Sequence, residues 1–152
     1  MLAGLSVPVQ SVLIDANVCI TLIQADELHI LNDIENHQFN VPDEVMQEVI
    51  RPPQNEILRQ AIDSGQITRI SITEAAELLL FADIRDNHRL GAGESACIAI
   101  AQSRGWSVAT DELGRCRRKL LILSTQLHQN RHRMVVLVLH ALISLNTKFA
   151  KL

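Results

Sequence analysis

The sequence has few aromatic residues: its 152 residues include one Trp, three Phe and no Tyr. A core of ordinary size must therefore be built from Leu, Ile, Val and Ala. The chain also lacks an excess of positive charge, since its formal net charge is −3. No overall basic field recruits nucleic acid, although a bound divalent cation can reverse the sign of the potential locally.

Cysteine is scarce as well, and the three cysteines, Cys19, Cys97 and Cys116, are far apart with no CxxC pair. This pattern favours reduced thiols in a cytoplasmic protein over a disulfide framework or a zinc site. The N-terminus has neither the basic flank nor the long apolar stretch of a signal peptide.

No apolar run reaches the ~20 residues that a membrane-spanning helix needs. The strongly apolar segment 134–145 is shorter and contains His140. We interpret it as a buried helix or a subunit contact, which leaves a homodimer open, and we expect no membrane association.

Apolar residues make up 47% of the chain, and no linker, internal repeat or low-complexity tract interrupts it. One compact domain spanning residues 1–152 is therefore expected. Short apolar runs alternate with longer helical patterns, which predicts an α/β fold with a parallel sheet and helices on its faces.

The predicted strands and short extended elements cover residues 11–15, 39–41, 67–72, 106–110 and 120–123. The predicted helices cover residues 18–24, 26–36, a segment from about 43 to the Pro52-Pro53 stop, 55–64, 74–86, 94–103, a basic stretch from about 112, and 133–145. Pro52-Pro53 ends a helix because proline has no amide donor, and Gly65 and Gly105 are typical residues at helix ends.

Four acids stand where the pattern otherwise indicates burial. Asp15 and Asp111 each end an apolar run that is predicted to be a strand, and Glu48 and Glu94 lie on the apolar faces of two separate helices. A carboxylate directed at a core is costly unless something pairs with it. Four of them together favour a bound cation.

The predicted elements place these acids near the edge of the sheet where the strands end. Ligands of parallel α/β sheets bind at this edge, outside the carboxyl ends of the strands. Oxygen donors without an accompanying His or Cys set suit Mg²⁺ or Mn²⁺ better than zinc. Asn17, two residues after Asp15, is placed to bond a carboxylate, a bound water or a substrate phosphate.

Each acid alone also has an ordinary interpretation. Asp15 and Asp111 are candidates for turn residues, Glu94 for a first-turn helix acid and Glu48 for a solvated helix residue. Two strand-end aspartates combined with two inward glutamates on separate helices favour the metal site.

Four segments carry a family resemblance: VLIDANVCI with Asp15, VPDEVMQEV with Glu48, LGAGESACIAIAQSRG with Glu94, and WSVATDELGRCRR with Asp111. In order and spacing they resemble the PIN domain, a family of small metal-dependent nucleases that includes VapC-like toxins of toxin–antitoxin pairs. A further acid often follows the last aspartate in this family, and Glu112 is adjacent here.

The resemblance implies a three-layer α/β/α sandwich with a central, mostly parallel sheet. It covers a motif-bearing part of about 11–124, followed by a predicted C-terminal helix of about 133–146. It implies an endoribonuclease that hydrolyses phosphodiester bonds with water activated by Mg²⁺ or Mn²⁺, and a catalytic metal pocket made of Asp15, Glu48, Glu94 and Asp111. An RNA substrate and a cognate antitoxin are the implied partners.

A basic cluster follows Asp111 and consists of Arg115, Arg117, Arg118 and Lys119. Beside a metal pocket such residues bind RNA phosphates without reading the base sequence. The ordinary alternative is a solvated helix face that pairs with acids.

Two other functions remain open. In a phosphatase of the haloacid dehalogenase type Asp15 would be the nucleophile, although Asn17 stands where that family usually has a second aspartate. In a non-catalytic module the same pocket would bind only metal or RNA.

Overall fold

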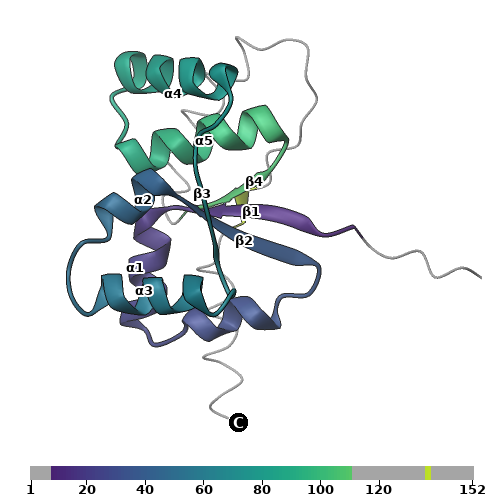
Figure 1. Cartoon of the computed structure of the whole chain (residues 1–152), viewed down its shortest axis with the longest axis vertical. Helices are drawn as coiled ribbons and strands as arrows, with labels where there is room; N and C mark the ends of the chain where they lie inside the picture. Colours follow the sequence, from purple (N-terminus) through teal and green to yellow (C-terminus); the bar gives the residue numbers. More distant parts are fainter. Residues whose placement is uncertain (1–7, 111–135, 138–152) are drawn as a thin grey trace, which may run out of the picture.

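The protein was analysed as a computed structural model, which describes residues 8–110 and the short strand at residues 136–137. Its sheet has five strands in the order β3-β2-β1-β4-β5, and all neighbouring pairs are parallel (Figure 1). The strands are β1 (Gln10–Ile14), β2 (His37–Pro42), β3 (Thr68–Ile70), β4 (Ser107–Ala109) and β5 (Val136–Leu137).

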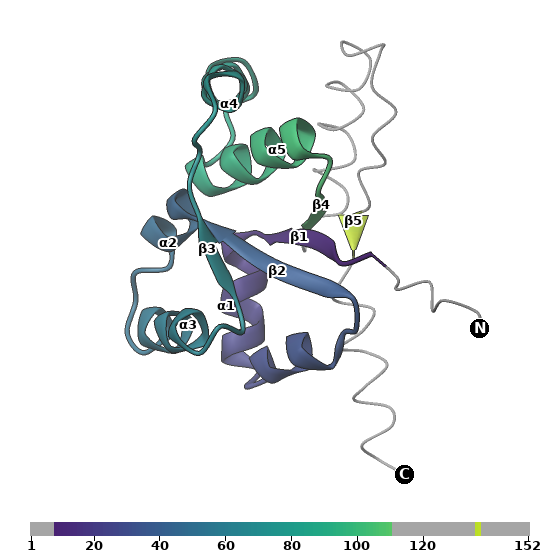
Figure 2. The same cartoon turned by 45° about the vertical axis from the view of Figure 1, so that its right-hand side comes forward.

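Helices cover both faces of this sheet (Figure 2). One layer holds α1 (Ala16–Gln24), α3 (Gln54–Asp63) and the 3₁₀ helix η1 (Leu28–Asp33), and the other holds α4 (Ala75–His88) and α5 (Ala92–Arg104). The short helix α2 (Asp43–Glu48) follows β2 directly and packs against α5. The predicted three-layer α/β/α sandwich with a parallel sheet is confirmed.

The core is aliphatic, as the composition predicts. Val12, Leu13 and Ile14 of the central strand β1 have no exposed surface, because both faces of a parallel sheet are covered by helices. The only aromatic side chain among the buried core residues described is Phe39. Within residues 8–110, no helix combines the length and the apolar character needed to cross a membrane.

A second apolar cluster joins α4 to α5 and contains Ile84, Leu90, Ile98 and Ala99. This contact holds α5 between the sheet and α4. The helix that carries Glu94 is therefore packed on two sides.

The predicted helix at 26–36 is shorter in the structure and is a 3₁₀ helix, η1, over Leu28–Asp33. Asp26 and Asn36 both have positive φ angles, of 57° and 58°, and only the 3₁₀ helix η1 forms between them. Asp and Asn adopt this left-handed conformation more readily than most residues, so they end regular helix at both sides.

The predicted C-terminal helix, 133–146, is contradicted where the structure describes it. Val136 and Leu137 form β5, in register with Val108 and Ala109 of β4. Periodicity does not separate a short buried strand from a buried helix, and this apolar run has no polar face to decide between them. The predicted strand at 120–123 and the basic helix from 112 lie outside the described residues, and the homodimer stays a prediction.

Candidate functional site

The strands β1 and β4 end side by side, and polar residues follow both of them. Ile14 pairs with Ala109, and the backbone amide of Asp15 donates to the carbonyl oxygen of Ala109 at 3.2 Å. Asp15 and Thr110 are therefore neighbours at the carboxyl edge of the sheet, where α/β proteins bind ligands. Both residues are buried, with exposed fractions of 7% and 3%.

A hydrogen bond at the start of α1 fixes the carboxylate of Asp15. Asp15 is the N-cap residue, and its Oδ1 accepts a hydrogen bond of 2.7 Å from the Ala16 amide. Its own carbonyl oxygen accepts from the Cys19 amide in the first helical turn. Asp is a preferred N-cap residue, so the sharp strand-to-helix turn and the position of the carboxylate have the same origin. Asn17, two residues later, is exposed at this end of α1.

Glu48 and Glu94 meet where α2 ends and α5 begins. Oε1 of Glu48, the last residue of α2, accepts a hydrogen bond of 2.8 Å from the Gly93 amide in the first turn of α5. Glu94 is the next residue of that turn and is half-buried, whereas Glu48 is exposed. The expectation that Glu48 points into buried surroundings is therefore not met, but its carboxylate does reach the helix that carries Glu94.

A buried thiol, Cys97, lies on α5 close to the end of β1. Cys97, one turn after Glu94, has its Sγ 3.8 Å from the carbonyl oxygen of Ile14, the residue before Asp15. Burial raises the pKa of Cys97 well above its usual range, and the negative charges of Asp15, Glu48 and Glu44 raise it further.

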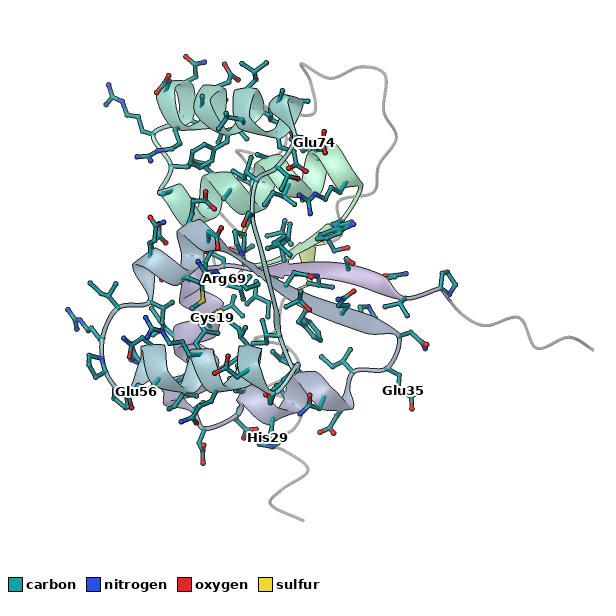
Figure 3. The ribbon with its side chains drawn as sticks, viewed as in Figure 1. Cys19, His29, Glu35, Glu56, Arg69 and Glu74 are labelled. Carbon is teal, nitrogen blue, oxygen red and sulfur yellow. The ribbon has the colours of Figure 1, made fainter. Side chains whose placement is uncertain are left out.

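The second buried thiol, Cys19 of α1, lies on the opposite side of the sheet from α5 (Figure 3). Burial, followed by the charge of Asp15, raises the pKa of Cys19 to about 12. Both cysteines are free, as the sequence predicts, and the third, Cys116, lies outside the described residues. Neither thiol is in the ionised form that metals or substrates react with at neutral pH.

Glu44 is an acid of this region that sequence reasoning missed. It precedes Glu48 by one helical turn, and its Oε2 is buried without a hydrogen-bond partner among the described residues. The signal was present in VPDEVMQEV, where two glutamates at i and i+4 share one helix face. Burying a carboxylate oxygen without a hydrogen-bond partner is unfavourable, so a cation bound nearby would stabilise it.

The chemistry of this donor set fits a hard divalent cation, since Asp15, Glu48, Glu94 and Glu44 supply only oxygen ligands. Within residues 8–110, however, no three acidic, His or Cys side chains lie close enough together to hold a metal ion. The fourth predicted ligand, Asp111, follows the buried Thr110 directly and lies outside the described residues. So do Glu112 and the basic cluster, Arg115, Arg117, Arg118 and Lys119.

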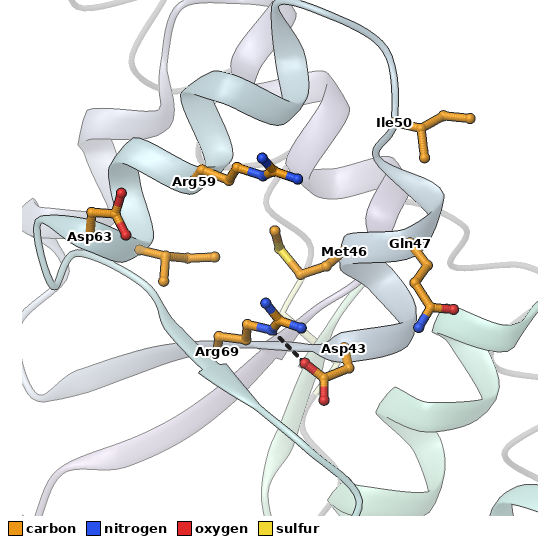
Figure 4. A pocket seen from close by; sticks show the side chains of 8 residues that line it. Asp43, Met46, Gln47, Ile50, Arg59, Asp63 and Arg69 are labelled. Carbon is orange, nitrogen blue, oxygen red and sulfur yellow. Dashed lines mark hydrogen bonds and ion pairs between the residues drawn. The ribbon is translucent and has the colours of Figure 1, made fainter.

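A separate pocket of about 590 Å³ lies between α2, α3 and β3 (Figure 4). Arg59 and Arg69 extend toward Met46 from α3 and β3, and the guanidinium of Arg69 is paired with Asp43. Among the described residues of the predicted site, Asp15, Asn17, Glu48 and Glu94, none lines this pocket. Its lining consists of Asp43, Met46, Gln47, Ile50, Arg59, Ile62, Asp63 and Arg69.

Comparison with known proteins agrees with this fold. A family model described as PIN domain matches residues 11–140, so the chain belongs to the PIN-domain family. The match extends past residue 124, into the tail that the sequence motifs do not cover. A search of curated proteins gave no match.

Two solved structures share the fold. VapBC2 from Rickettsia felis, bound to a DNA fragment from its promoter, superposes with a TM-score of 0.54 at 14% sequence identity. DNA-bound VapBC from Salmonella typhimurium superposes with a TM-score of 0.55 at 18% identity. Each comparison covers 72% of this chain and 92% of the other chain. At these identities the likeness concerns the fold.

Proposed function

We propose that this PIN-domain protein is an endoribonuclease that hydrolyses RNA phosphodiester bonds with the help of Mg²⁺ or Mn²⁺. The observation that carries the proposal is membership in the PIN-domain family, and it is supported by Asp15 at the carboxyl end of β1 and by the contact of Glu48 with the first turn of α5, next to Glu94. Neighbouring carboxylates repel one another, and a divalent cation with oxygen ligands removes this repulsion.

The residues that would hold the cation are Asp15, Glu48, Glu94 and Asp111. When bound, such an ion lowers the pKa of a coordinated water and stabilises negative charge on a phosphate. The chain itself supplies orientation: the N-cap hydrogen bond fixes the Asp15 carboxylate, and the α5 amide fixes that of Glu48. No side chain has to act as a covalent nucleophile.

Substrate contacts are assigned to residues around this edge. Asn17 is exposed on the first turn of α1, from which its amide group can donate to a phosphate oxygen. Glu112 is assigned a supporting polar role beside Asp111. The basic cluster, Arg115, Arg117, Arg118 and Lys119, is assigned to RNA phosphates, which gives affinity without sequence preference.

Substitution of Asp15 tests this function. Asp15→Asn keeps the N-cap, because Asn caps helices as well as Asp does, but removes the charge. We expect cleavage of labelled RNA in Mn²⁺ to fall by at least ~100-fold, the upper end of what loss of a metal's supporting residue costs. Asp26→Asn is the matched control, since Asp26 is exposed and Asn tolerates its positive φ equally.

The same assay separates the alternatives. Cleavage by Asp15→Asn at the wild-type rate, or wild-type cleavage that persists in a chelator, contradicts the proposal. RNA binding with no cleavage of any RNA tested would favour the non-catalytic module. A phosphorylated Asp15 trapped during turnover would favour the haloacid dehalogenase-like phosphatase, which membership in the PIN-domain family argues against.

We also propose a small protein partner of the antitoxin kind. The support is that the two solved structures compared above are VapBC proteins. The product of a small open reading frame adjacent to the gene is the candidate. Co-purification at a fixed ratio together with loss of RNA cleavage would support the proposal, and unchanged cleavage with a full excess of that product would contradict it.

A further inference from the structure

In the first turn of α5, the side chains of Glu48 and Val45 occupy the space that a Cβ atom at residue 93 would need, so a larger residue there would displace the Glu48 carboxylate. A Cβ atom placed on Gly93 would lie 2.7 Å from Oε2 of Glu48, 3.1 Å from its Cδ and 3.0 Å from Cγ2 of Val45. Real Cβ atoms do not approach other heavy atoms as closely as 2.7 Å. The carboxylate of Glu48 therefore occupies the space that any other residue at position 93 would fill.

The backbone at this position also binds the same carboxylate. The Gly93 amide donates to Oε1 of Glu48 at 2.8 Å. Residue 93 thus contributes both a hydrogen-bond donor and the free space that lets the acceptor reach it. Gly91, two residues earlier, is different, because its added Cβ would be in ordinary contact, 3.4 Å from Oε1 of Glu48.

Glycine is an unfavourable choice for this position by local criteria. Gly93 lies inside the helix, where alanine is the better residue because glycine has more backbone freedom to lose. Its φ is not in the left-handed region that requires glycine. The tertiary contact with Glu48, and not the conformation of the helix, accounts for the missing side chain.

We propose that Gly93 is a positioning residue. Its amide and the free space beside it hold the Glu48 carboxylate against α5, at a fixed position relative to Glu94. This inference rests on the proposed function, because it concerns two of the acids assigned to the divalent cation. Glu48 is exposed at the end of a six-residue helix, and without the hydrogen bond to Gly93 its long side chain has several rotamers open to it. A cation held by Glu48 and Glu94 needs both carboxylates in one arrangement.

The decisive comparison is Gly93→Ala against the control Gly91→Ala. We expect Gly93→Ala to lower Mn²⁺ affinity, measured by electron paramagnetic resonance of free Mn²⁺, by roughly 10–100-fold, as loss of an orienting partner does in metal sites. RNA cleavage should then need correspondingly more Mn²⁺, with a smaller change in the rate at saturating metal. Gly91→Ala should keep the wild-type affinity. Wild-type affinity in Gly93→Ala would overturn the inference.

A second pair of variants tests whether the effect passes through Glu48. In the Glu48→Ala background the carboxylate is absent, so adding Gly93→Ala should cause little further loss of Mn²⁺ affinity. An equally large loss in that background would overturn the positioning role, because the alanine would then act through the helix itself.

Amide hydrogen exchange covers the case in which Gly93→Ala does not fold, and it needs neither metal nor RNA. Exchange of the Gly93 amide should be roughly tenfold faster in Glu48→Ala than in the wild type, with the exchange of core amides unchanged. Equal rates would refute the contact. If the wild type binds no Mn²⁺ and cleaves no RNA, but Gly93 amide exchange still differs between the wild type and Glu48→Ala, the proposed function is refuted. The contact between Gly93 and Glu48 is then still supported.

Discussion

Glu77 is a carboxylate with no exposed surface, and its neighbours explain how it is tolerated. Nε and Nη2 of Arg104 donate to its two oxygens, and the amides of Thr73 and Glu74 donate to Oε2. The guanidinium of Arg104 also lies 5.1 Å from the centre of the Trp106 ring. The two Arg104 donors tie α4 to the end of α5, and the two amides cap the start of α4.

Removal of Arg104 should leave Glu77 charged and buried without its main partner. We expect Arg104→Ala to lower the free energy of unfolding by about 3–5 kcal/mol, measured by urea denaturation at neutral pH. Arg69→Ala is the control, because the Arg69 side chain is 57% exposed in its pair with Asp43. Arg69→Ala should lower the free energy of unfolding by no more than about 1 kcal/mol. Similar costs for the two variants would contradict this account of Glu77.

The same ion pair predicts a dependence of stability on pH. The hydrogen bond from Arg104 holds the pKa of Glu77 below its usual value, despite burial. Stability from this group is therefore fully present above the unfolded pKa of about 4.3 and is lost as pH falls through the lower folded value.

Urea midpoints measured from about pH 7 down to about pH 3 should thus fall less steeply in Glu77→Gln than in the wild type. Asp43→Asn is the comparison, since the pKa of Asp43 is also lowered, first by the Ser71 hydroxyl and then by Arg69. Its effect should be smaller because water screens this partly exposed pair. A slope unaffected by Glu77→Gln would refute the assignment.

Among the helices, α4 has two apolar sides with different surroundings. Ile84 is fully buried against Leu90 and Ile98, whereas Leu78 and Leu79 are 58% and 73% exposed. A helix with apolar residues on both sides gives a weak amphipathic pattern, so the sequence alone does not say which side faces α5.

Paired substitutions distinguish the two sides of α4. Ile84→Ala should lower the free energy of unfolding by about 2–5 kcal/mol, because it opens a cavity between α4 and α5. Leu79→Ala should change it by no more than about 0.5 kcal/mol. Urea denaturation measures both. A large cost for Leu79→Ala would mean that this side is covered in solution.

Helices whose ends carry strong local signals were predicted well. The predicted helix 94–103 corresponds to α5, which ends at Gly105 with a positive φ of 70°, and the predicted helix 74–86 corresponds to α4. In segment 26–36 the helix is only the 3₁₀ helix η1, because the left-handed Asp26 interrupts an otherwise helical pattern. The strand at 136–137 depends on its partner β4, and a sequence window contains no information about that partner.

At the scale of the whole molecule, the candidate site depends on contacts between distant segments. The strand-end position of Asp15 was predictable, because an apolar run ends there and parallel strands end at one edge. The hydrogen bond from the Gly93 amide to Glu48 was not predictable, because helical periodicity defines a face of the helix and not the atom that a long side chain reaches. Glu44, by contrast, could have been found, because it shares a helix face with Glu48 at i and i+4.

Divalent metal should stabilise the whole molecule if the acids bind it. Adding Mn²⁺ to chelator-treated protein should raise the thermal midpoint, by the equivalent of about 2.7 kcal/mol when its concentration is 100 times the dissociation constant. Differential scanning calorimetry measures the shift, which Asp15→Asn should reduce and Asp26→Asn should leave unchanged. An equal shift in Asp15→Asn would indicate binding elsewhere.

The pairing of β1 with β4 has a consequence for synthesis of the chain. Val12 and Ser107 are partners in the sheet although almost the whole described chain separates them. Parallel strands so distant in sequence pair late, because a large loop must close before any contact forms. On the ribosome, the edge bearing Asp15 therefore stays unassembled until the segment around Ser107 has emerged, which delays any activity of that edge until most of the polypeptide has been made.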